Sequence, residues 1–342
     1  MSDPESKHQL PGLSLVKKTI RLGIVGCGQL VREVHLPILS RMTTVQVFAL
    51  ADPNPASLEA CASLAPKAIH FSSIEKLLAL PQLDAVLVAS PSAEHAHHAI
   101  AVLNADKALY LEKPMASSLP EARLILAAAG PNNQPAMMGF NYRFHPLVQI
   151  AREQLRGRSV DEVRSIFSIA PQPLPGWKQH RASGGGALLD FGSHHLDLLS
   201  YILDQRITAV EAGITSQRSE HDTATLQIHL ASGTRASGFY SFCATEQDSI
   251  EIQSGSLNIR IERYHPLNFP LSPLAKFVHY QLDRLRSPWH EVSFHLSLAA
   301  WCHSIQIGSL PPVTLNDGYN TMRAIHAAES SAISGNIVQL EQ

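Results

Sequence analysis

The sequence predicts an α/β protein in which a doubly wound parallel sheet is followed by an α+β region with a large, mainly antiparallel open sheet. Two observations carry this prediction. Before residue 140, short and almost wholly apolar runs alternate with helical patterns, which is typical of a parallel sheet covered on both faces. After about residue 160, polar and apolar residues alternate between turn residues, as antiparallel strands require.

The first part reads as strands and helices in alternation. Its apolar runs are the length of strands, and the segments between them place apolar residues at helical spacing. We expect strands at 19–26, 45–52, 83–90 and 136–140, a helix, turn and strand within 92–114, and further helical segments at 30–42, 55–65, 73–80 and near 118–129.

The second part contains two plausible hairpin turns, Ser232-Gly233 and Ser254-Gly255, each between runs of period two. Residues 171–176 read as a Pro-rich loop, and the segment 183–203 is expected to be helical from about residue 186. We therefore expect an open sheet with helices on one face.

Composition narrows the class of function. The 342 residues include 45% hydrophobic and 16% charged residues, and the formal net charge is −2, so no basic field favours nucleic acid or acidic membranes. No apolar stretch approaches the length of a membrane span, and four scattered cysteines indicate neither a disulfide framework nor a zinc knuckle. We expect a cytoplasmic protein that acts on a small molecule.

The first predicted strand ends in a glycine-rich turn, Gly26-Cys27-Gly28, that leads into a helix. Glycines there permit a tight turn and the close approach of a pyrophosphate, which the helix N-terminus then binds. Gln29 and Leu30 open that helix and complete the predicted cofactor contact. Val31 stands where a third glycine is usual, and a plain tight turn remains the alternative.

Asp52 supports the dinucleotide interpretation. It ends the second predicted strand, where a carboxylate can accept hydrogen bonds from a ribose diol. The residues after it include no Arg or Lys that would neutralise a 2′-phosphate, which the carboxylate would repel. The sequence therefore predicts NAD as cofactor, with NADP disfavoured.

Lys113 is the first candidate catalytic residue. It lies between Glu112 and Pro114, and the proline favours an extended backbone that would direct the lysine off the carboxyl edge of the sheet. Ligands of open α/β sheets bind at that edge. Taken alone, Lys113 would be a solvated charge at a strand end.

The segment 183–203 supplies the other candidates. On a regular helix Asp190, His194 and Asp197 share one face, while His195 falls on the packed face. Asp190 and His194 are four residues apart, so the carboxylate can orient the imidazole for acid–base chemistry. An exposed helix pair is the alternative. The glycine run 184–186 can bring the backbone close to a ligand, or form a flexible loop.

Other residues are weaker candidates. Trp177 and Arg181, with Lys178 and His180 between them, can line a carbohydrate pocket, although a tryptophan in a loop also serves as a packing anchor. Tyr142 and Arg143 lie at the predicted domain junction and can contact substrate or fix the geometry between domains.

A metal site is not expected. Of His95, His97 and His98, only the first and third share a helix face, and no Cys or carboxylate completes a ligand set.

These motifs together resemble the glucose–fructose oxidoreductase, inositol dehydrogenase and MocA-like family over nearly the whole chain. The resemblance rests on GIVGCG at 23–28, SPSAEHAHHAI at 90–100, LEKP at 111–114, GFNYRFHP at 139–146, GGGALLDFGSHHLD at 184–197, and the C-terminal segment from Asn316.

The resemblance implies a Rossmann domain and an α+β domain whose open sheet forms an oligomer interface. It also implies that Lys113, Asp190 and His194 form the family's catalytic set. The cofactor residues that it implies are Gly26, Gly28 and Asp52, with Ser90, Pro91, His95 and Glu112 along the nicotinamide side. Lys113 is predicted to contact both cofactor and substrate. Ser92 departs from the pattern, because asparagine is common at that position.

We therefore expect a disordered tail at 1–17, an NAD-binding Rossmann domain at 18–140, and a substrate-binding and oligomerisation domain at 141–342. The predicted function is hydride transfer between nicotinamide and a secondary alcohol or ketone of a sugar, sugar derivative or cyclic polyol. The expected assembly is a homodimer or homotetramer through the C-terminal sheet. The alternatives are a non-catalytic nicotinamide-binding sensor or subunit, and a reductase of a sugar nucleotide or tetrapyrrole.

Overall fold

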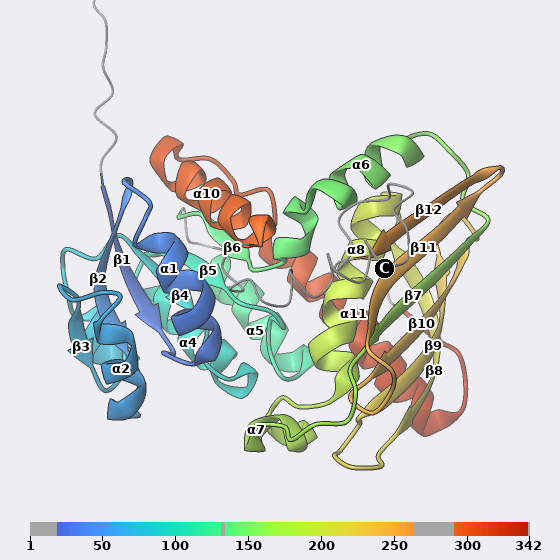
Figure 1. Cartoon of the computed structure of the whole chain (residues 1–342), viewed down its shortest axis with the longest axis horizontal. Coiled ribbons are helices and arrows are strands. Elements are labelled where there is room, and N and C mark those ends of the chain that lie inside the picture. Colours follow the sequence, from blue (N-terminus) through green and yellow to red (C-terminus); the bar gives the residue numbers. More distant parts are fainter. Residues whose placement is uncertain (1–18, 131–133, 263–290, 341–342) are drawn as a thin grey trace, which may run out of the picture.

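The protein has two lobes, each built on its own sheet (Figure 1). The computed structural model describes residues 19–130, 134–262 and 291–340, so the expected tail at 1–17 lies outside the described residues. Within those ranges no helix combines the length and apolar character that a bilayer span needs.

The first lobe contains a parallel sheet of six strands in the order β3-β2-β1-β4-β5-β6, which confirms the predicted doubly wound sheet. The strand order reverses between β1 and β4, and ligands of such sheets bind at the carboxyl ends of the strands at this switch point. The strands are β1 Ile20–Val25, β2 Val45–Ala51, β3 Ile69–Phe71, β4 Ala85–Val88, β5 Ala108–Leu111 and β6 Ala136–Met138.

Helices connect these strands much as the sequence predicts. The first helical segment differs, because it begins with a π-helical turn, η1 Val31–His35, before the short α1 Leu36–Leu39. The other helical elements are α2 Pro55–Ala62, α3 Ile74–Leu78, the 3₁₀ turn η2 Ser92–Glu94, α4 His95–Asn104 and α5 Leu119–Ala129.

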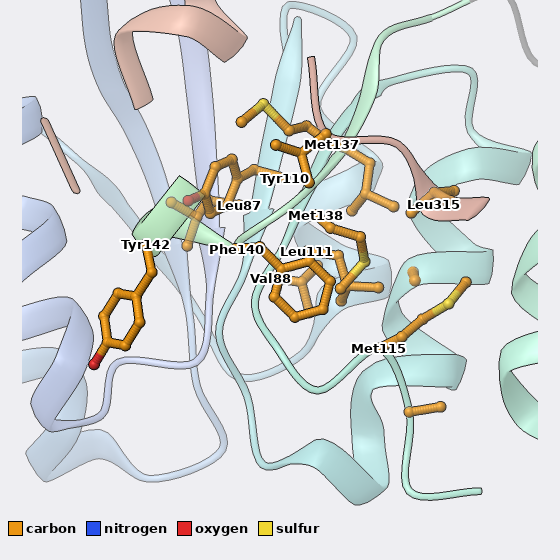
Figure 2. Packing of buried hydrophobic residues seen from close by; sticks show 14 of the residues in the cluster. Leu87, Val88, Tyr110, Leu111, Met115, Met137, Met138, Phe140, Tyr142 and Leu315 are labelled. Carbon is orange, nitrogen blue, oxygen red and sulfur yellow. The ribbon is translucent and has the colours of Figure 1, made fainter. Parts of the chain in front are cut away.

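A helix from the end of the chain also packs on the first lobe. In α10, Val292–Ile307, the Ser297 hydroxyl lies 2.9 Å from the Tyr110 hydroxyl of β5, and the fully buried Trp301 ring lies 5.4 Å from that of Tyr110. Figure 2 shows the apolar core around Tyr110, with Tyr142 projecting away from Phe140 and Met138. The chain thus returns to the first lobe with α10 before α11 and β13 complete the second lobe.

The second lobe contains seven strands in the order β12-β11-β7-β10-β9-β8-β13. All neighbours are antiparallel except β7 and β10, which confirms the expected mainly antiparallel sheet. Both predicted hairpin turns form, with Gly233 and Gly255 at positive φ. The strands are β7 Glu162–Ser168, β8 Ile207–Thr215, β9 Thr223–Leu230, β10 Arg235–Ser241, β11 Gln247–Ser254, β12 Leu257–Glu262 and β13 Val338–Gln339.

The helices of this lobe lie on the side of the sheet that faces the first lobe (Figure 1). They are α6 Pro146–Leu155, α8 Ser193–Leu203 and α11 Leu315–Ser334, with α7 Gly176–Gln179 at the lower edge of the interface. The segment expected to be one helix from residue 186 instead begins with a π-helical turn, η5 Leu188–Gly192, and continues as α8.

Candidate active site

The glycine turn after β1 has the shape that a phosphate site needs. Gly26 has φ +88°, and a Cβ on it would lie 2.6 Å from the backbone nitrogen of Ser90 at the end of β4. A Cβ on Gly28 would meet nothing within 4 Å, so the turn opens on free space there. Glycine at 26 thus lets two strand ends meet, while Gly28 leaves room for a bound group.

Asp52 holds this turn from the next strand. Its Oδ2 accepts the backbone N–H of Cys27 at 2.7 Å, and its Oδ1 accepts that of Asn54 at 2.8 Å. Each carboxylate oxygen can accept a second hydrogen bond, so the ribose contact remains available. These residues fit a dinucleotide. Gln29 is exposed and bonded to Glu33, while the Leu30 side chain packs on the core.

The residues expected beside the nicotinamide mainly order the loops that follow β4 and β5. The buried His95 ring lies 2.8 Å from the Ser90 carbonyl oxygen and 2.6 Å from that of Pro114. Glu112 is also buried, 2.9 Å from His35 through Oε1, and its Oε2 accepts the Lys113 backbone N–H. The Ser90 hydroxyl lies 2.8 Å from His98 Nδ1, and Pro91 is exposed.

The two lobes meet at Asp190. The Lys113 ammonium of the first lobe donates to Asp190 Oδ1 at 2.8 Å and to its backbone carbonyl at 3.2 Å. The Lys178 ammonium donates to Oδ2 at 2.6 Å. Burial alone would raise the pKa of this carboxyl, but the two ammonium groups outweigh it and hold the pKa far below the usual range. Asp190 is therefore ionised at any working pH.

His194 lies one turn further along the same segment. Its ring is 7% exposed and stacks on Tyr142 with centroids 4.2 Å apart. Its Nδ1 is buried without a hydrogen-bond partner in the described part of the chain. Burial, and then the charge of Lys113, lower the pKa of His194 well below 6.5. The imidazole is therefore neutral and able to accept a proton.

The expected direct pairing of Asp190 with His194 does not form among the described residues. Both Asp190 oxygens are engaged by lysines, and residues 188–192 form a wider π-helical turn, which changes how residues four apart align. Residues 193–199 are all buried, so the alternative of an exposed helix pair is wrong and the polar side chains of His194 and Asp197 lie inside the protein. His195 is packed, as expected, against Ser165 and Asp248.

The side chain of Arg143 is buried in ion pairs with two helices of the second lobe. It is 7% exposed and donates two hydrogen bonds to Asp197 in α8, at 2.8 and 2.5 Å, and it pairs with Asp317 in α11 at 3.0 Å. Burial raises the pKa of Asp197 to about 6, and Arg143 opposes that shift. The alternative role, fixing the geometry of the junction, is the one that these contacts support.

The predicted pocket residues around α7 differ in their contacts. Arg181 pairs with Glu329 at 2.5 Å and donates to the Ser117 carbonyl, so it ties the loop to α11 and the first lobe. Trp177 is 38% exposed, which contradicts the alternative of a buried packing anchor. The contact of Lys178 with Asp190 was not predicted, because no local pattern shows which carboxylate a loop lysine will reach.

A histidine cluster lies on the surface of the first lobe. Ligand atoms of Glu94, His97 and His98 come within 4.8 Å of one another, although the sequence analysis found no carboxylate for this group. The signal was present in the spacing, since Glu94 precedes the histidines by three and four residues. His97 also lies 3.6 Å from Glu75.

Comparisons with known proteins show the family to which the chain belongs. Residues 20–140 match the oxidoreductase family with an NAD-binding Rossmann fold, and residues 148–256 match the GFO/IDH/MocA C-terminal domain. The chain belongs to this family of oxidoreductases, and its cofactor is NAD.

Individual relatives extend over the whole fold. Inositol 2-dehydrogenase from Rhizobium meliloti (strain 1021) is 23% identical over 322 residues, covering 92% of this chain and 97% of that protein. The structure of myo-inositol 2-dehydrogenase from Lactobacillus plantarum superposes with a TM-score of 0.81 at 18% identity, covering 95% of this chain and 100% of that one. The WlbA dehydrogenase from Bordetella pertussis, solved with NADH and UDP-GlcNAcA, also gives 0.81, at 21% identity over 95% and 99%.

Proposed function

We propose that this protein is an NAD-dependent dehydrogenase of a secondary alcohol carried by a sugar, sugar derivative or cyclic polyol, or the corresponding ketone reductase. The observation that carries the proposal is the Lys113–Asp190 ion pair between the lobes, whose two charges also act on the buried imidazole of His194. Relatives that act on inositol support the same substrate class.

The glycine turn and Asp52 would hold NAD, and its nicotinamide would supply the acceptor or donor of the hydride. His194, whose lowered pKa keeps the imidazole neutral, accepts the hydroxyl proton at Nε2, because its Nδ1 is buried. Lys113 donates a hydrogen bond to the same substrate oxygen and stabilises the negative charge that develops there. Asp190 holds the ammonium in place and offsets part of its charge. In the reductive direction His194 returns the proton to the alcohol oxygen.

We also propose how the chain divides this work. Residues 18–140 bind NAD, while residues 141–342 bind the substrate and join copies of the chain as a homodimer or homotetramer. The helices of the second lobe cover one face of the second sheet (Figure 1). An open hollow of about 730 Å³ lies on the other face, with Arg164, Gln227 and Phe239 among its lining residues. A second copy would cover this face. The four unpaired cysteines suit a reducing compartment such as the cytoplasm.

A panel of sugars, sugar acids and cyclic polyols, each offered with NAD⁺ while NADH formation is followed, tests the proposed activity. Turnover of at least one panel member is the expected result. Tight NADH binding without turnover of any alcohol or ketone would instead support the alternative, a non-catalytic nicotinamide-binding sensor. Native mass spectrometry of the same preparation reports the number of subunits.

A further inference from the structure

Asp190 is shared by two ammonium groups, and the proposed mechanism uses one of them. Lys113 occupies Oδ1 at 2.8 Å, and Lys178 occupies Oδ2 at 2.6 Å. The Lys178 side chain is 26% exposed, and its ammonium lies 5.3 Å from the centre of the Trp177 ring. Lys178 thus lies at the entrance of the same site with one side open to solvent.

The position of Lys178 is built into the fold. A Cβ on Gly185 would lie 2.4 Å from the Lys178 carbonyl oxygen and 2.8 Å from that of His180. The Gly185 N–H also donates to the His180 carbonyl at 3.0 Å, and the Glu220 N–H donates to that of Gln179. The glycine run therefore holds the α7 segment against the loop that leads to Asp190.

The charges around Asp190 do not balance. Lys113 and Lys178 contribute two positive charges and Asp190 one negative charge, while His194 is neutral. The charged groups further out make contacts of their own and add no net positive charge, since Arg143 contacts two carboxylates, Asp197 and Asp317, and Arg181 contacts Glu329. Glu112 and Glu220 contact His35 and His180. The group formed by Lys113, Lys178 and Asp190 therefore carries one positive charge in a partly dehydrated site, where it attracts a nearby anion more strongly than it would in water.

Lys178 also has hydrogen-bond capacity to spare. An ammonium carries three donors, and within the described residues one of them is used, on Asp190 Oδ2. The remaining two can bind oxygens of a ligand that enters beside Lys113. A carboxylate or phosphate would accept hydrogen bonds from both N–H donors and would also be attracted by the positive charge. A neutral hydroxyl would accept a hydrogen bond but gain little from the charge.

We propose that Lys178 is a specificity-determining residue that binds an anionic oxygen group of the substrate, so that the enzyme prefers a sugar acid or sugar phosphate to a neutral sugar or polyol. This inference rests on the proposed function and narrows its substrate class. The anion lies near the reacting hydroxyl, because both lysines contact the same carboxylate.

The test compares acidic and neutral ligands of the NADH-loaded protein by calorimetry, and their kcat/KM with NAD⁺ where they are turned over. D-Glucuronate and D-glucose 6-phosphate represent the two anion types, and D-glucose is the neutral reference. Lys178→Gln removes the charge at similar length, and Lys178→Arg retains it. Lys67→Gln, at an exposed position on the first lobe, is the matched control for loss of one positive charge.

For the natural sequence we expect at least one acidic ligand to bind about tenfold or more tightly than glucose, the effect of one charge-assisted contact. Lys178→Gln should abolish this preference, Lys178→Arg should keep most of it, and Lys67→Gln should leave it unchanged. The ligand that shows the preference identifies carboxylate or phosphate as the recognised group.

Equal binding of acidic and neutral ligands by the natural sequence would overturn the inference. So would a preference that survives Lys178→Gln. Neither result affects the proposed function if glucose or a polyol is turned over. Conversely, an acid preference that depends on Lys178, found without turnover of any alcohol, would retain the anion site and reject the dehydrogenase.

Discussion

Ser92 of the first lobe and Gly184 of the second lobe are in direct contact. The Ser92 hydroxyl donates to the Gly184 carbonyl at 3.2 Å, and a Cβ on Gly184 would lie 1.8 Å from that hydroxyl oxygen. The contact links the loop after β4 with the glycine run before Asp190. Glycine at 184 therefore lets the lobes approach closely enough for Lys113 to reach Asp190.

Gly184→Ala should destabilise the protein by more than the cost of placing an alanine at positive φ. Its φ of +89° costs an alanine about 1–2 kcal/mol, and the clash with Ser92 adds about 1–3 kcal/mol. The control is Gly157→Ala, where φ is +72° but nothing lies within 4 Å of the added Cβ. Denaturant unfolding measures both variants. Equal losses of stability would show that the close approach to Ser92 does not matter.

Lys113→Ala and His194→Ala should each lower turnover by about 10²- to 10⁴-fold, the usual contribution of a positioned acid–base group. NAD affinity should stay nearly unchanged, because the glycine turn and Asp52 lie apart from both side chains in the fold. Steady-state kinetics and NADH binding by fluorescence separate the two effects. Parallel losses of turnover and NADH binding would instead indicate a general disturbance of the cleft.

The neutral state of His194 leads to a pH prediction. Its folded pKa lies below the unfolded value of about 6.5, so the stability gained by keeping it neutral is present above that pH and is lost as the pH falls. Activity that needs neutral His194 should likewise persist to pH values below 6.5. Lys113→Met removes a charge that lowers this pKa, so the His194 titration followed by NMR should move to higher pH. A shift to lower pH would contradict the placement of the ammonium.

Arg143 should matter for stability. Removing one partner of a buried ion pair costs about 3–5 kcal/mol, so Arg143→Met should lower the free energy of unfolding by that order, because Asp197 is left buried without its main partner. Arg143→Lys keeps the charge but loses the two-pronged contact and should be intermediate. Unfolding curves provide the measurement. A variant that keeps full stability but has a raised KM would instead support the predicted role of Arg143 in binding substrate.

Periodicity predicted both sheets because burial on one or two faces leaves a direct trace in the sequence. Strand β3 escaped prediction because Ile69 and His70 are exposed, so this short edge strand has no apolar pattern. The return of α10 to the first lobe is a long-range packing event that no local pattern encodes.

Part of the candidate site was predicted from its positions at the ends of strands. Gly26, Asp52 and Lys113 follow strand ends, and the topology of a parallel sheet brings such positions together. The partner of Asp190 depended on the π-helical turn at 188–192 and on where α7 packs, and both arise from tertiary contacts. Spacing on an ideal helix therefore suggested His194, whereas the structure shows Lys113 and Lys178.

Asp52 should control both the affinity for the cofactor and the choice between NAD and NADP. Its two oxygens accept the Cys27 and Asn54 backbone N–H groups, so Asp52→Asn turns an amide N–H₂ toward one of these donors and removes the charge that binds a ribose diol. Hydrogen bonds to a charged group contribute about 1.5–3 kcal/mol, so their loss should weaken NADH binding about 10- to 100-fold.

NADPH binding should weaken less than NADH binding in Asp52→Asn, or improve, because the repulsion between the carboxylate and the 2′-phosphate disappears. The dissociation constant of NADPH divided by that of NADH, both measured by fluorescence titration, should therefore fall. Asp106→Asn is a suitable control, since Asp106 is exposed, has φ +52°, and asparagine tolerates that conformation. An unchanged ratio in Asp52→Asn would mean that cofactor choice is determined elsewhere in the turn.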